Sequence, residues 1–525
     1  MKYVIERVLS PPSNSRRYNT TLCPVQSGIF MEFTTIIGLE VHVQLLTESK
    51  LFCSCANRFG DQPNTLTCPV CLGLPGILPV MNRRAFQLSL KAAVALDCKI
   101  ARHTKWDRKQ YYYPDLPKNY QISQYDLPFS HDGYLNLPLS ETNKTEARQI
   151  GIIRVHLEED AGKMIHDESS GEKASRVDLN RSGTPLLEIV SQPDIRSPSE
   201  ARQYLEELKL LLRYLRVSDC NMQEGSLRVD ANVNLHIHTD GPPIATPIVE
   251  VKNMNSFRAV EHALEYEVIR QQEEFQRTGI QHGSVPKQTR GWDDASECTF
   301  EQRSKEEASD YRYLPDPDLL PVHVKDDYLQ QVRQSIGELP ARLRARFENQ
   351  FDIPSYDTDV IINHGSELAG YFEVVAETCN DGKLASNWVM QDVLRTLNEQ
   401  TLSIDEFSLK AEQLGELLTT VKKGTLSTAI AREVFSDMVR TGKSAYDIIS
   451  SRNLEQISDT TELSTLITKV LSEQSDALVD FKNPKKQKQV IGYLTGQVLR
   501  ASQGKANPGL VRSLLEEQLS ALDSD

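Results

Sequence analysis

Apolar and polar residues alternate strictly at residues 36–45, which read IIGLEVHVQL. One parity holds Leu39, Val41, Val43 and Leu45, and the other holds Glu40, His42 and Gln44. Because successive side chains of a β-strand point to opposite sides, this pattern predicts a strand with one apolar and one polar face. The apolar face is expected to enter the core, while the polar face is either a solvated surface or a functional site.

The same two-faced alternation recurs in five further segments, at residues 154–160, 176–180, 186–190, 226–238 and 248–253. Glu188 stands alone in the apolar run 186–190, where a carboxylate requires a cation or another partner. A single strand of this kind is most simply a solvated sheet edge, but the whole set favours one polar sheet face. The polar positions of the other four segments hold Arg154, His156, Glu158, Arg176, Asp178, Asn180, Arg228, Asp230, Asn232, Asn234, His236, Glu250 and Lys252.

Helical patterns are interspersed with these strands. Residues 197–217 and 256–279 carry apolar side chains at helical spacing, with Ser197 or Ser199 and then Ser256 as candidate N-caps. Gly279 is a typical helix stop. Since helices and strands do not follow a regular βαβ order, the sequence favours an α+β fold with an antiparallel sheet.

Strand patterns nearly vanish after the proline-rich segment 314–322, and helical patterns continue to the C-terminus. We therefore predict an N-terminal extension at residues 1–32, an α+β body at 33–325, an all-helical middle region at 326–405 and a helical tail at 406–525.

Size and charge exclude some classes of protein. A chain of 525 residues is too long for one core and suggests about three units. The net charge of −14 argues against a surface that is basic throughout, although a local basic patch for a polyanion remains open. No apolar run approaches the roughly 18 residues of a membrane helix, so no membrane partner is expected.

Cysteine usage and the N-terminus indicate the compartment. Nine cysteines, four of them in one short segment, do not suggest a secreted disulfide framework and favour the reducing cytoplasm. Residues 1–30 are basic and precede Met31. We interpret them as a disordered extension or as the product of a misplaced start codon, with Met31 as the true initiator. A transit peptide is the alternative.

Four cysteines form the sharpest local motif. Cys53, Cys55, Cys68 and Cys71 are spaced as C-x-C, twelve residues and C-x-x-C. Two pairs of thiolates joined by a polar loop are typical of a tetrahedral structural zinc site. Sulfur would fill all four positions, so a zinc-dependent hydrolase is excluded because no coordination position stays open.

The polar strand faces indicate a different chemistry. Carboxylates suit Mg²⁺, which often shares substrate phosphates, and arginine and lysine suit the remaining phosphoryl charge. A nucleotide-dependent reaction is therefore the class we infer. The sequence has no G-x-x-x-x-G-K-[ST], G-x-G-x-x-G, H-E-x-x-H or G-x-S-x-G motif at a suitable place, so any ATP is not held by a P-loop.

Two segments rich in aromatic residues, 108–126 and 304–318, either stack on a base or ribose or simply pack as loops. Lys109 or Lys118 in the first of them is placed to meet phosphate. In the tail, a basic cluster is either a solvated helix start or an RNA-backbone contact, and it consists of Lys482, Lys485, Lys486, Lys488 and Arg500.

Nine blocks of the sequence, in order from residue 33 to the C-terminus, resemble the GatB family, the B subunits of aspartyl/glutamyl-tRNA amidotransferases. They include IIGLEVHVQL, CPVCLGLPGILPVMN, YYYPDLPKNYQISQYD, RVHLEEDAGKMIHD, LNRSGTPLLEIVSQPDIRSP, MQEGSLRVDANVN and KEEASDYRYLPDPDL. The resemblance implies a catalytic cradle domain, a helical linker domain and a YqeY-like tail that grips tRNA, which correspond to the three regions predicted above.

The resemblance also implies the reaction and its partners. The family phosphorylates the side-chain carboxyl of misacylated Glu-tRNA(Gln) or Asp-tRNA(Asn) with ATP, and ammonia then displaces phosphate. A GatA-type amidase releases that ammonia from glutamine, and a small GatC-type subunit completes a heterotrimer. The rival hypothesis is a non-catalytic, zinc-stabilised scaffold that binds tRNA for the amidase.

By resemblance, the catalytic residues are Glu40, His42, Glu158 and Glu188, with Glu159 as a possible substitute for Glu158. His42, Glu158 and Glu188 would hold magnesium. The resemblance makes Arg181, Glu224, Arg228, Asp230 and Lys252 candidates for contacts with ATP or the acyl adduct. The chain departs from the family pattern at Asn119, where glycine is commoner, and at Ser182, Thr184 and Ala506, none of which is a proposed ligand.

Overall fold

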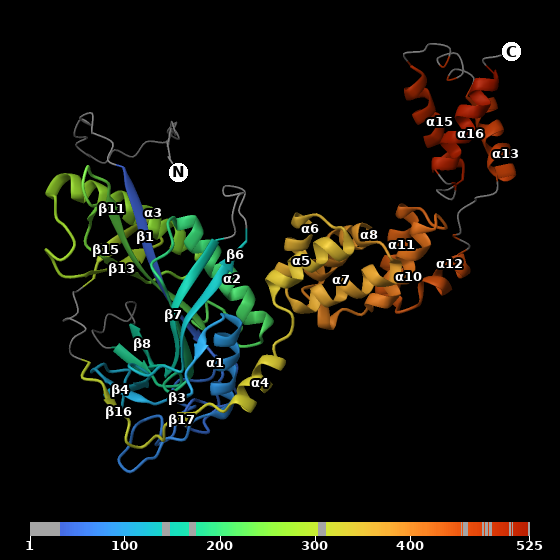
Figure 1. Cartoon of the computed structure of the whole chain (residues 1–525). Helices are drawn as coiled ribbons and strands as arrows, with labels where there is room; N and C mark the ends of the chain where they lie inside the picture. The colour runs from blue at the N-terminus through green and yellow to red at the C-terminus, as the bar shows by residue number, and fades with distance from the viewer. Residues whose placement is uncertain are drawn as a thin grey trace.

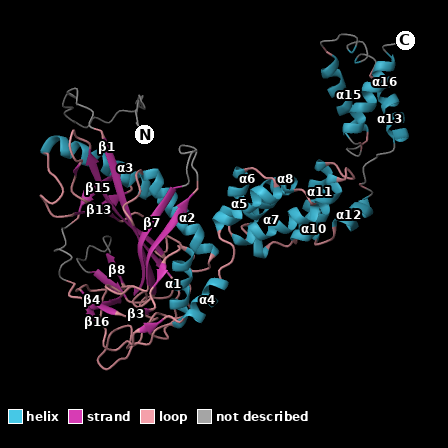
Figure 2. Cartoon of the chain, in the orientation of Figure 1, coloured by secondary structure: helices cyan, strands magenta, loops and turns pink. Residues whose placement is uncertain are grey.

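The computed structural model describes residues 32–138, 148–166, 175–302, 311–452, 454, 460–474, 477, 481, 486–502, 506 and 508–522. The chain forms an α+β body followed by a helical middle region and a C-terminal group of helices (Figures 1 and 2). Residues 1–31 of the predicted extension, residues 304–310 of the second aromatic segment, and Lys482 and Lys485 lie outside the described residues.

A ten-stranded sheet is the centre of the body, with the order β15-β14-β13-β11-β1-β10-β7-β6-β2 and with β12 paired to β11. All neighbouring pairs are antiparallel except β13 and β14. The predicted α+β fold with an antiparallel sheet is confirmed. The strands are β1 (Phe33–Gln44), β2 (Lys99–Ile100), β6 (Ser130–Leu137), β7 (Arg148–Glu159), β10 (Pro185–Ser191), β11 (Leu227–Ile237), β12 (Ile244–Ala245), β13 (Val249–Lys252), β14 (Gln288–Asp293) and β15 (Cys298–Glu301).

The apolar parity of β1 enters the core of the body, as its alternation predicts. Leu39, Val41 and Val43 are buried and share one hydrophobic cluster with helices α1 (Arg83–Ala95), α2 (Pro198–Tyr214) and α3 (Phe257–Thr278). These helices contact β7, β6 and β11 respectively. Because they cover the apolar side of the sheet, the polar parity of the strands points to its other side.

The ends of α2 and α3 follow their predicted capping signals. The Ser197 Oγ accepts a hydrogen bond from the Glu200 amide at 3.2 Å, and the Ser256 Oγ accepts one from the Ala259 amide at 3.0 Å. Each bond satisfies an amide that the first turn leaves without a helical partner. Gly279, with φ of 66°, ends α3 in the left-handed conformation that glycine adopts without strain.

Three small sheets lie beside the large one, and they correct one prediction. Residues 176–180 do not extend the polar face of the large sheet, because β9 pairs with β8 in a separate sheet. Asp178 and Asn180 instead accept hydrogen bonds from the amides of Asn64 and Leu66, at 3.1 and 2.8 Å, and hold the cysteine loop. The strands are β3 (His103–Thr104), β4 (Asp107–Gln110), β5 (Tyr120–Ser123), β8 (Lys163–His166), β9 (Ser175–Asp178), β16 (Leu314–Pro315) and β17 (Val322–His323).

The first helix after residue 325, α4 (Asp326–Gln334), joins the core of the body through Leu329 and Val332, and the later helices form two further hydrophobic clusters, one from α5 to α12 and one from α13, α15 and α16. Arg344 of α5 joins the first of them to the body, because its guanidinium donates to both carboxylate oxygens of Glu207 on α2, at 2.9 and 2.8 Å. Among the described residues, no helix has the length and apolar content that crossing a lipid bilayer requires. The helices are α4 (Asp326–Gln334), α5 (Pro340–Phe351), α6 (Ser355–Asn363), α7 (Ser366–Cys379), α8 (Gly382–Trp388), a π-helical turn (Val389–Val393), α9 (Leu394–Gln400), a 3-10 turn (Ile404–Glu406), α10 (Ala411–Lys422), α11 (Thr428–Thr441), α12 (Ala445–Arg452), α13 (Thr460–Glu473), α15 (Gln487–Ala501) and α16 (Pro508–Leu522).

Candidate active site

A row of ionisable side chains crosses four strands on the polar side of the sheet. The register pairs His156 of β7 with Glu188 of β10, Glu188 with His42 of β1, and His42 with Arg228 of β11. Residues directly opposite each other in antiparallel strands share a face. The alternation of each strand sets its polar side, and the register brings these four side chains together.

The imidazoles and carboxylates of this row are close to one another. His156 Nε2 lies 3.1 Å from Glu188 Oε2, and His42 Nε2 lies 3.5 Å from the same oxygen. Glu158, two residues beyond His156 on β7, lies 4.0 Å from His42 and 3.8 Å from His156, and accepts a hydrogen bond from the Ser123 hydroxyl at 3.1 Å. His156, Glu158 and Glu188 are buried. The contacts with His156 and His42 confirm that the carboxylate of Glu188 has partners.

Burial and charge act against each other at these groups. Burial lowers the pKa of His156, but the carboxylates of Glu188 and Glu158 outweigh it and raise that pKa to about 9. The pKa of His42 is also raised, against its burial, mainly by Glu188. Burial raises the pKa of Glu188, yet His156 and His42 hold it well below its usual range. The carboxylates of the row therefore favour the protonated form of the imidazoles beside them, and the imidazoles favour the ionised form of the carboxylates.

The ligand atoms of His42, Glu158 and Glu188 lie within 4.8 Å of one another and fit a divalent cation. His42 Nε2 and the Glu158 carboxylate are 4.0 Å apart, which is too far for a direct hydrogen bond. A cation between these two groups would therefore not have to break one. Two carboxylates suit Mg²⁺, and an imidazole in the set also suits a transition metal.

A second acidic group lies on the neighbouring strands. Oxygens of Glu40, Asp230 and Glu250 also lie within 4.8 Å of one another. The Lys252 ammonium separates two of them, at 2.5 Å from Asp230 and 2.7 Å from Glu250. The Asn232 amide donates to Glu40 at 3.0 Å. This group lies next to the row, because the register pairs Glu40 with Asp230 and, two residues along each strand, His42 with Arg228.

Asp160, just after β7, holds two cations of the site. Its Oδ2 accepts hydrogen bonds from Arg228 at 2.7 Å and from the side-chain amide of Gln44 at 2.9 Å, and Arg181 Nε lies 3.6 Å away. Arg181 also donates to the carbonyl oxygens of Ala161 and Gly162, at 3.0 and 2.6 Å. Arg228 Nε is buried and has no hydrogen-bond partner among the residues that the structure describes, so this guanidinium has a donor left for a ligand.

Lysine and tyrosines from the two aromatic segments border the carboxylates. Lys109 Nζ lies 4.9 Å from the centre of the Tyr311 ring, and Tyr125 stacks on Tyr313 with ring centres 4.0 Å apart. Burial lowers the pKa of Lys109, but Glu158 and other nearby groups outweigh it and raise that pKa. The lysine therefore carries a positive charge beside the candidate site, as expected of a group that meets phosphate.

Two predicted residues lie apart from the row. Glu224 is exposed in the turn before β11 and makes none of the contacts described above. Glu159 has the opposite parity to Glu158, and its carboxylate is bound by Lys118 and by the Ile122 amide. It therefore does not replace Glu158.

Sequence reasoning placed His156 and Glu250 on the polar strand faces but did not single them out as site residues, and it did not name Asp160. His156 and Glu250 had a usable signal, since each stands at a polar position of its alternating segment. Asp160 has the parity of Glu158 but lies just beyond the last strand residue, and its role depends on Arg228 of a distant strand, which no local pattern indicates. Asn119, in contrast, has φ of 58°, a conformation that asparagine tolerates better than most residues and that explains glycine as its alternative.

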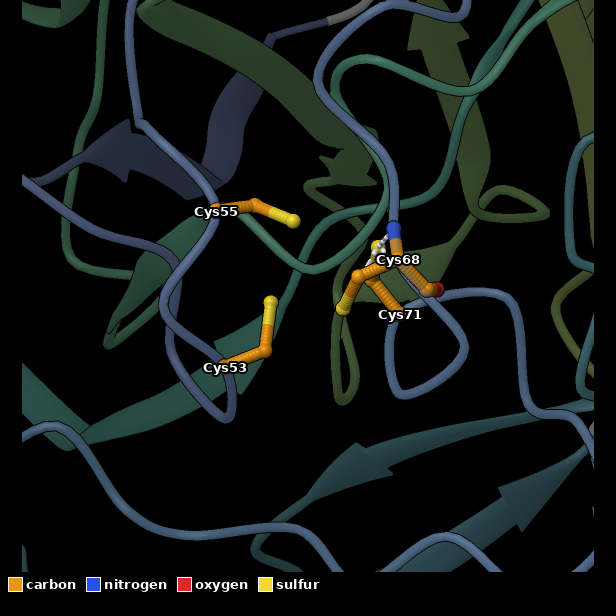
Figure 3. A group of neighbouring side chains, drawn as sticks. All are labelled: Cys53, Cys55, Cys68 and Cys71. Carbon is orange, nitrogen blue, oxygen red and sulfur yellow. Dashed lines mark hydrogen bonds between the residues drawn. The ribbon is translucent and has the colours of Figure 1, made fainter.

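The four cysteines converge in a separate place, within the long loop between β1 and α1 (Figure 3). Their sulfur atoms all lie within 4.8 Å of one another, which fits a tetrahedral zinc site. Cys71 accepts a hydrogen bond from the Cys68 amide at 3.2 Å. The neighbouring Cys53 thiol lowers the pKa of the Cys71 thiol to about 4, with further contributions from the Cys68 amide and from the charge of Lys50. The set therefore favours a thiolate at Cys71.

Two family models and several known proteins match this chain. A family model described as "GatB/GatE catalytic domain" matches residues 35–330, and one described as "GatB domain" matches residues 370–519. A Rhodopirellula baltica protein, named as the B subunit of an aspartyl/glutamyl-tRNA(Asn/Gln) amidotransferase, is 52% identical over 489 residues, which cover 93% of this chain and 97% of that protein. Proteins of the same name from Moorella thermoacetica and Thermoanaerobacter pseudethanolicus are 48% and 46% identical, and each alignment covers 93% of this chain and 100% of the relative.

Proposed function

The chain belongs to the GatB family of aspartyl/glutamyl-tRNA(Asn/Gln) amidotransferase B subunits, and on this premise we propose that the row from His156 to Arg228 is its site of carboxyl activation. Its role is that of a tRNA-dependent amidotransferase subunit, an enzyme whose family implies ATP use. The family model of the catalytic domain matches residues 35–330. The scaffold hypothesis is set aside because the matched domain is a catalytic one.

The proposed reaction has two steps. A side-chain carboxylate oxygen of Glu-tRNA(Gln) or Asp-tRNA(Asn) attacks the γ-phosphorus of ATP, the bond to the bridging oxygen breaks, and ADP leaves. Ammonia then attacks the carbonyl carbon of the acyl phosphate, loses a proton and expels inorganic phosphate. The first step is necessary because a carboxylate is anionic and has no leaving group.

The first step brings an anionic carboxylate to an anionic phosphate, so the site must supply positive charge. Arg228 has a buried donor with no partner among the described residues. Arg181 lies beside Asp160, and Lys252 is paired with Asp230. His42, Glu158 and Glu188 would hold Mg²⁺, which supplies charge neutralisation to phosphate oxygens when bound. Glu40 lies beside Asp230 at the edge of this group.

One observation carries the proposal: four strands in register place His156, Glu188, His42 and Arg228 in one row, with His156 and Glu188 buried, within the segment that matches the catalytic domain. A surface with no chemical role would not need to bury two carboxylates among imidazoles, since burying charge is costly.

The family names a multi-subunit enzyme, and we propose partners for this chain on that basis. A GatA-type amidase supplies the ammonia, and a small GatC-type subunit completes the heterotrimer. In the tail, Lys486, Lys488 and Arg500 of the α15 region are the described members of the basic cluster proposed to contact the tRNA backbone. The four cysteines hold structural zinc, and reduced thiols of this kind suit the cytoplasm.

The test is glutaminyl-tRNA formation by the reconstituted complex with Glu-tRNA(Gln), ATP and magnesium, using ammonium chloride in place of glutamine. Glu188→Gln keeps the size of the side chain and removes its charge. We expect product formation to fall about a hundredfold or more, because transition-state charge is no longer balanced. Glu301→Gln, on the exposed end of β15 in the same sheet, is the matched control and should keep full activity.

Circular dichroism and tRNA binding establish that the variant is folded. A folded Glu188→Gln protein as active as the wild type would contradict the assignment of the row. A wild-type complex that binds tRNA tightly but forms no product with ammonium chloride would restore the scaffold hypothesis.

A further inference from the structure

A lysine is fully buried beside the cysteine cluster. Lys50 has 0% of its surface exposed and lies between β1 and Cys53. Its backbone amide donates to the Cys55 carbonyl at 3.0 Å, and its own carbonyl accepts from the Asn82 side chain at 3.2 Å. The backbone on both sides of the lysine is therefore fastened, and the side chain cannot reach solvent without opening this loop.

The Lys50 ammonium has no carboxylate partner in the described part of the chain. It donates to the Leu66 carbonyl at 2.7 Å and lies 3.7 Å from Cys71 Sγ. The carboxylate of Glu159, which lines the same pocket as Cys53 and Cys71, is bound by Lys118, and none of the ion pairs among the described residues includes Lys50. Lysine is almost never fully buried unless it is paired, because an unpaired ammonium in the interior is costly.

The cysteine sulfurs are the remaining source of negative charge. A divalent ion with four thiolates has a net charge of −2, and one ammonium offsets half of it. The Lys50 ammonium contacts Cys71 Sγ, which also accepts the hydrogen bond from the Cys68 amide at 3.2 Å.

The backbone at Gly183 packs against both Lys50 and Cys71. Gly183 has φ of 85°, and a Cβ at this position would lie 3.4 Å from Cys71 Cβ and 3.6 Å from Lys50 Cδ. Its carbonyl accepts a hydrogen bond from the Leu51 amide at 2.8 Å. The backbone just before β10 is thus held directly against the stem of the lysine.

We propose that Lys50 is a positioning residue for the four-cysteine site: its buried ammonium, hydrogen-bonded to Cys71, neutralises part of the tetrathiolate charge and so strengthens zinc binding. This inference rests on the zinc site proposed above. Lys50 is not itself a ligand, since an ammonium has no lone pair to donate.

The experiment is a metal titration of the full-length chain after chelation and reduction. Co²⁺ is added first, because tetrahedral Co²⁺ bound by thiolates has visible absorption and a sulfur-to-metal charge-transfer band, and Zn²⁺ is then used to displace it. The variant is Lys50→Met, which keeps an unbranched chain without the charge. The matched control is Lys91→Met, since Lys91 also donates to a buried carbonyl, that of Leu215 at 3.0 Å, but has no sulfur partner among the described contacts.

We expect Lys50→Met to bind Zn²⁺ about 10- to 100-fold more weakly, the range typical of lost outer-shell partners. The charge-transfer band should move to lower energy, because a thiolate without its hydrogen bond gives up an electron more easily. A loss of packing alone would not shift this band. Lys91→Met should match the wild type in both measurements.

A wild type that binds metal with the tetrathiolate spectrum, and a Lys50→Met variant with unchanged affinity and band, would overturn the inference about Lys50 while the zinc site stands. A wild type that binds no metal would remove the zinc site itself.

If Lys50→Met does not fold, acetylation of wild-type lysines followed by mass spectrometry decides the question. Lys50 should be protected in the Zn²⁺-bound protein and react after chelation. Reaction of Lys50 in the Zn²⁺-bound protein at the rate of an exposed lysine would refute the proposal, because the ammonium would then not lie against Cys71.

Discussion

Replacement of Asp160 by asparagine removes the anion that holds two guanidinium groups on the polar face. The carboxylate is 4% exposed, and its Oδ2 accepts from Arg228 at 2.7 Å and from Gln44 at 2.9 Å, with Arg181 Nε at 3.6 Å. Asparagine keeps the shape but offers an amide group where a charged acceptor is needed. The two arginines then lose their shared counterion.

The expected loss follows from the burial of each partner. Breaking a buried ion pair costs about 3–5 kcal/mol, because it leaves a charge without compensation. The Arg228 and Arg181 side chains are 36% and 31% exposed, so water solvates part of their charge. We therefore expect Asp160→Asn to lower the free energy of unfolding of the body by about 2–4 kcal/mol at pH 7.

The effect should depend on pH in a defined direction. Burial raises the pKa of Asp160, but the attraction of Arg228 and Arg181 outweighs it and holds that pKa below the ordinary value of 3.8. A carboxyl whose pKa is lower in the folded state stabilises the protein above its unfolded pKa, and loses this contribution as pH falls through the folded value. The difference between wild type and variant should be constant from about pH 7 to 5 and shrink below about pH 4.

Urea unfolding followed by tryptophan fluorescence measures this difference. The chain has three tryptophans, of which Trp106 and Trp292 belong to the core of the body and Trp388 to the helical core. A Trp388→Phe background therefore reports the body alone. Asp132→Asn is the control, because Asp132 is an exposed acid on the same sheet whose left-handed backbone, φ of 51°, suits asparagine.

The control should be indistinguishable from the background protein. A difference below about 0.5 kcal/mol for Asp160→Asn at pH 7, the range of ordinary surface changes, would refute the idea that this carboxylate holds the cations. A difference that stays the same down to pH 3 would show that the effect is not electrostatic.

Three further predictions use other parts of the chain. Because Asn119 has φ of 58°, Asn119→Gly should leave the unfolding free energy of the body within about 0.5 kcal/mol, whereas Asn119→Val should lower it by about 1–2 kcal/mol; equal effects in the urea assay would contradict this. Lys252→Met removes the cation at 2.5 Å from Asp230 and should raise KM for ATP in the ammonium-dependent assay about 10- to 100-fold, so an unchanged KM would exclude Lys252 from the site. Arg344→Met removes the paired hydrogen bonds to Glu207 at 2.9 and 2.8 Å, and calorimetry should show the helical middle region melting at least about 2 °C lower; an unchanged trace would mean that this contact does not join the two parts.

Local patterns predicted much of the fold. The alternation at residues 36–45 predicted β1 and its buried parity, and Ser197 and Ser256 predicted the starts of α2 and α3. These predictions succeed because a strand repeats every two residues and a helix cap depends on residues three positions apart. The prediction for residues 176–180 was wrong. Their alternation is real, but no local signal tells which sheet a strand joins.

The candidate site was predicted in part. Glu40, His42, Glu158 and Glu188 stand on polar strand positions that sequence alone identifies, whereas the resemblance to a family was needed to connect them with ATP and tRNA. His156 was overlooked although it has the same parity as Glu158. Its contact with Glu188 at 3.1 Å depends on the pairing of β7 with β10.

The sequence by itself determined which side of each strand is polar, where the two main helices of the body begin, and which four cysteines can meet. Each of these depends on spacing within a few residues or on the chemistry of the side chains. Only the tertiary structure decided that Arg228 lies opposite His42, that Asp160 holds two arginines, and that Lys50 is buried against Cys71. Such contacts join residues distant in the chain, and they are set by strand order, register and the exclusion of water, which no local pattern encodes.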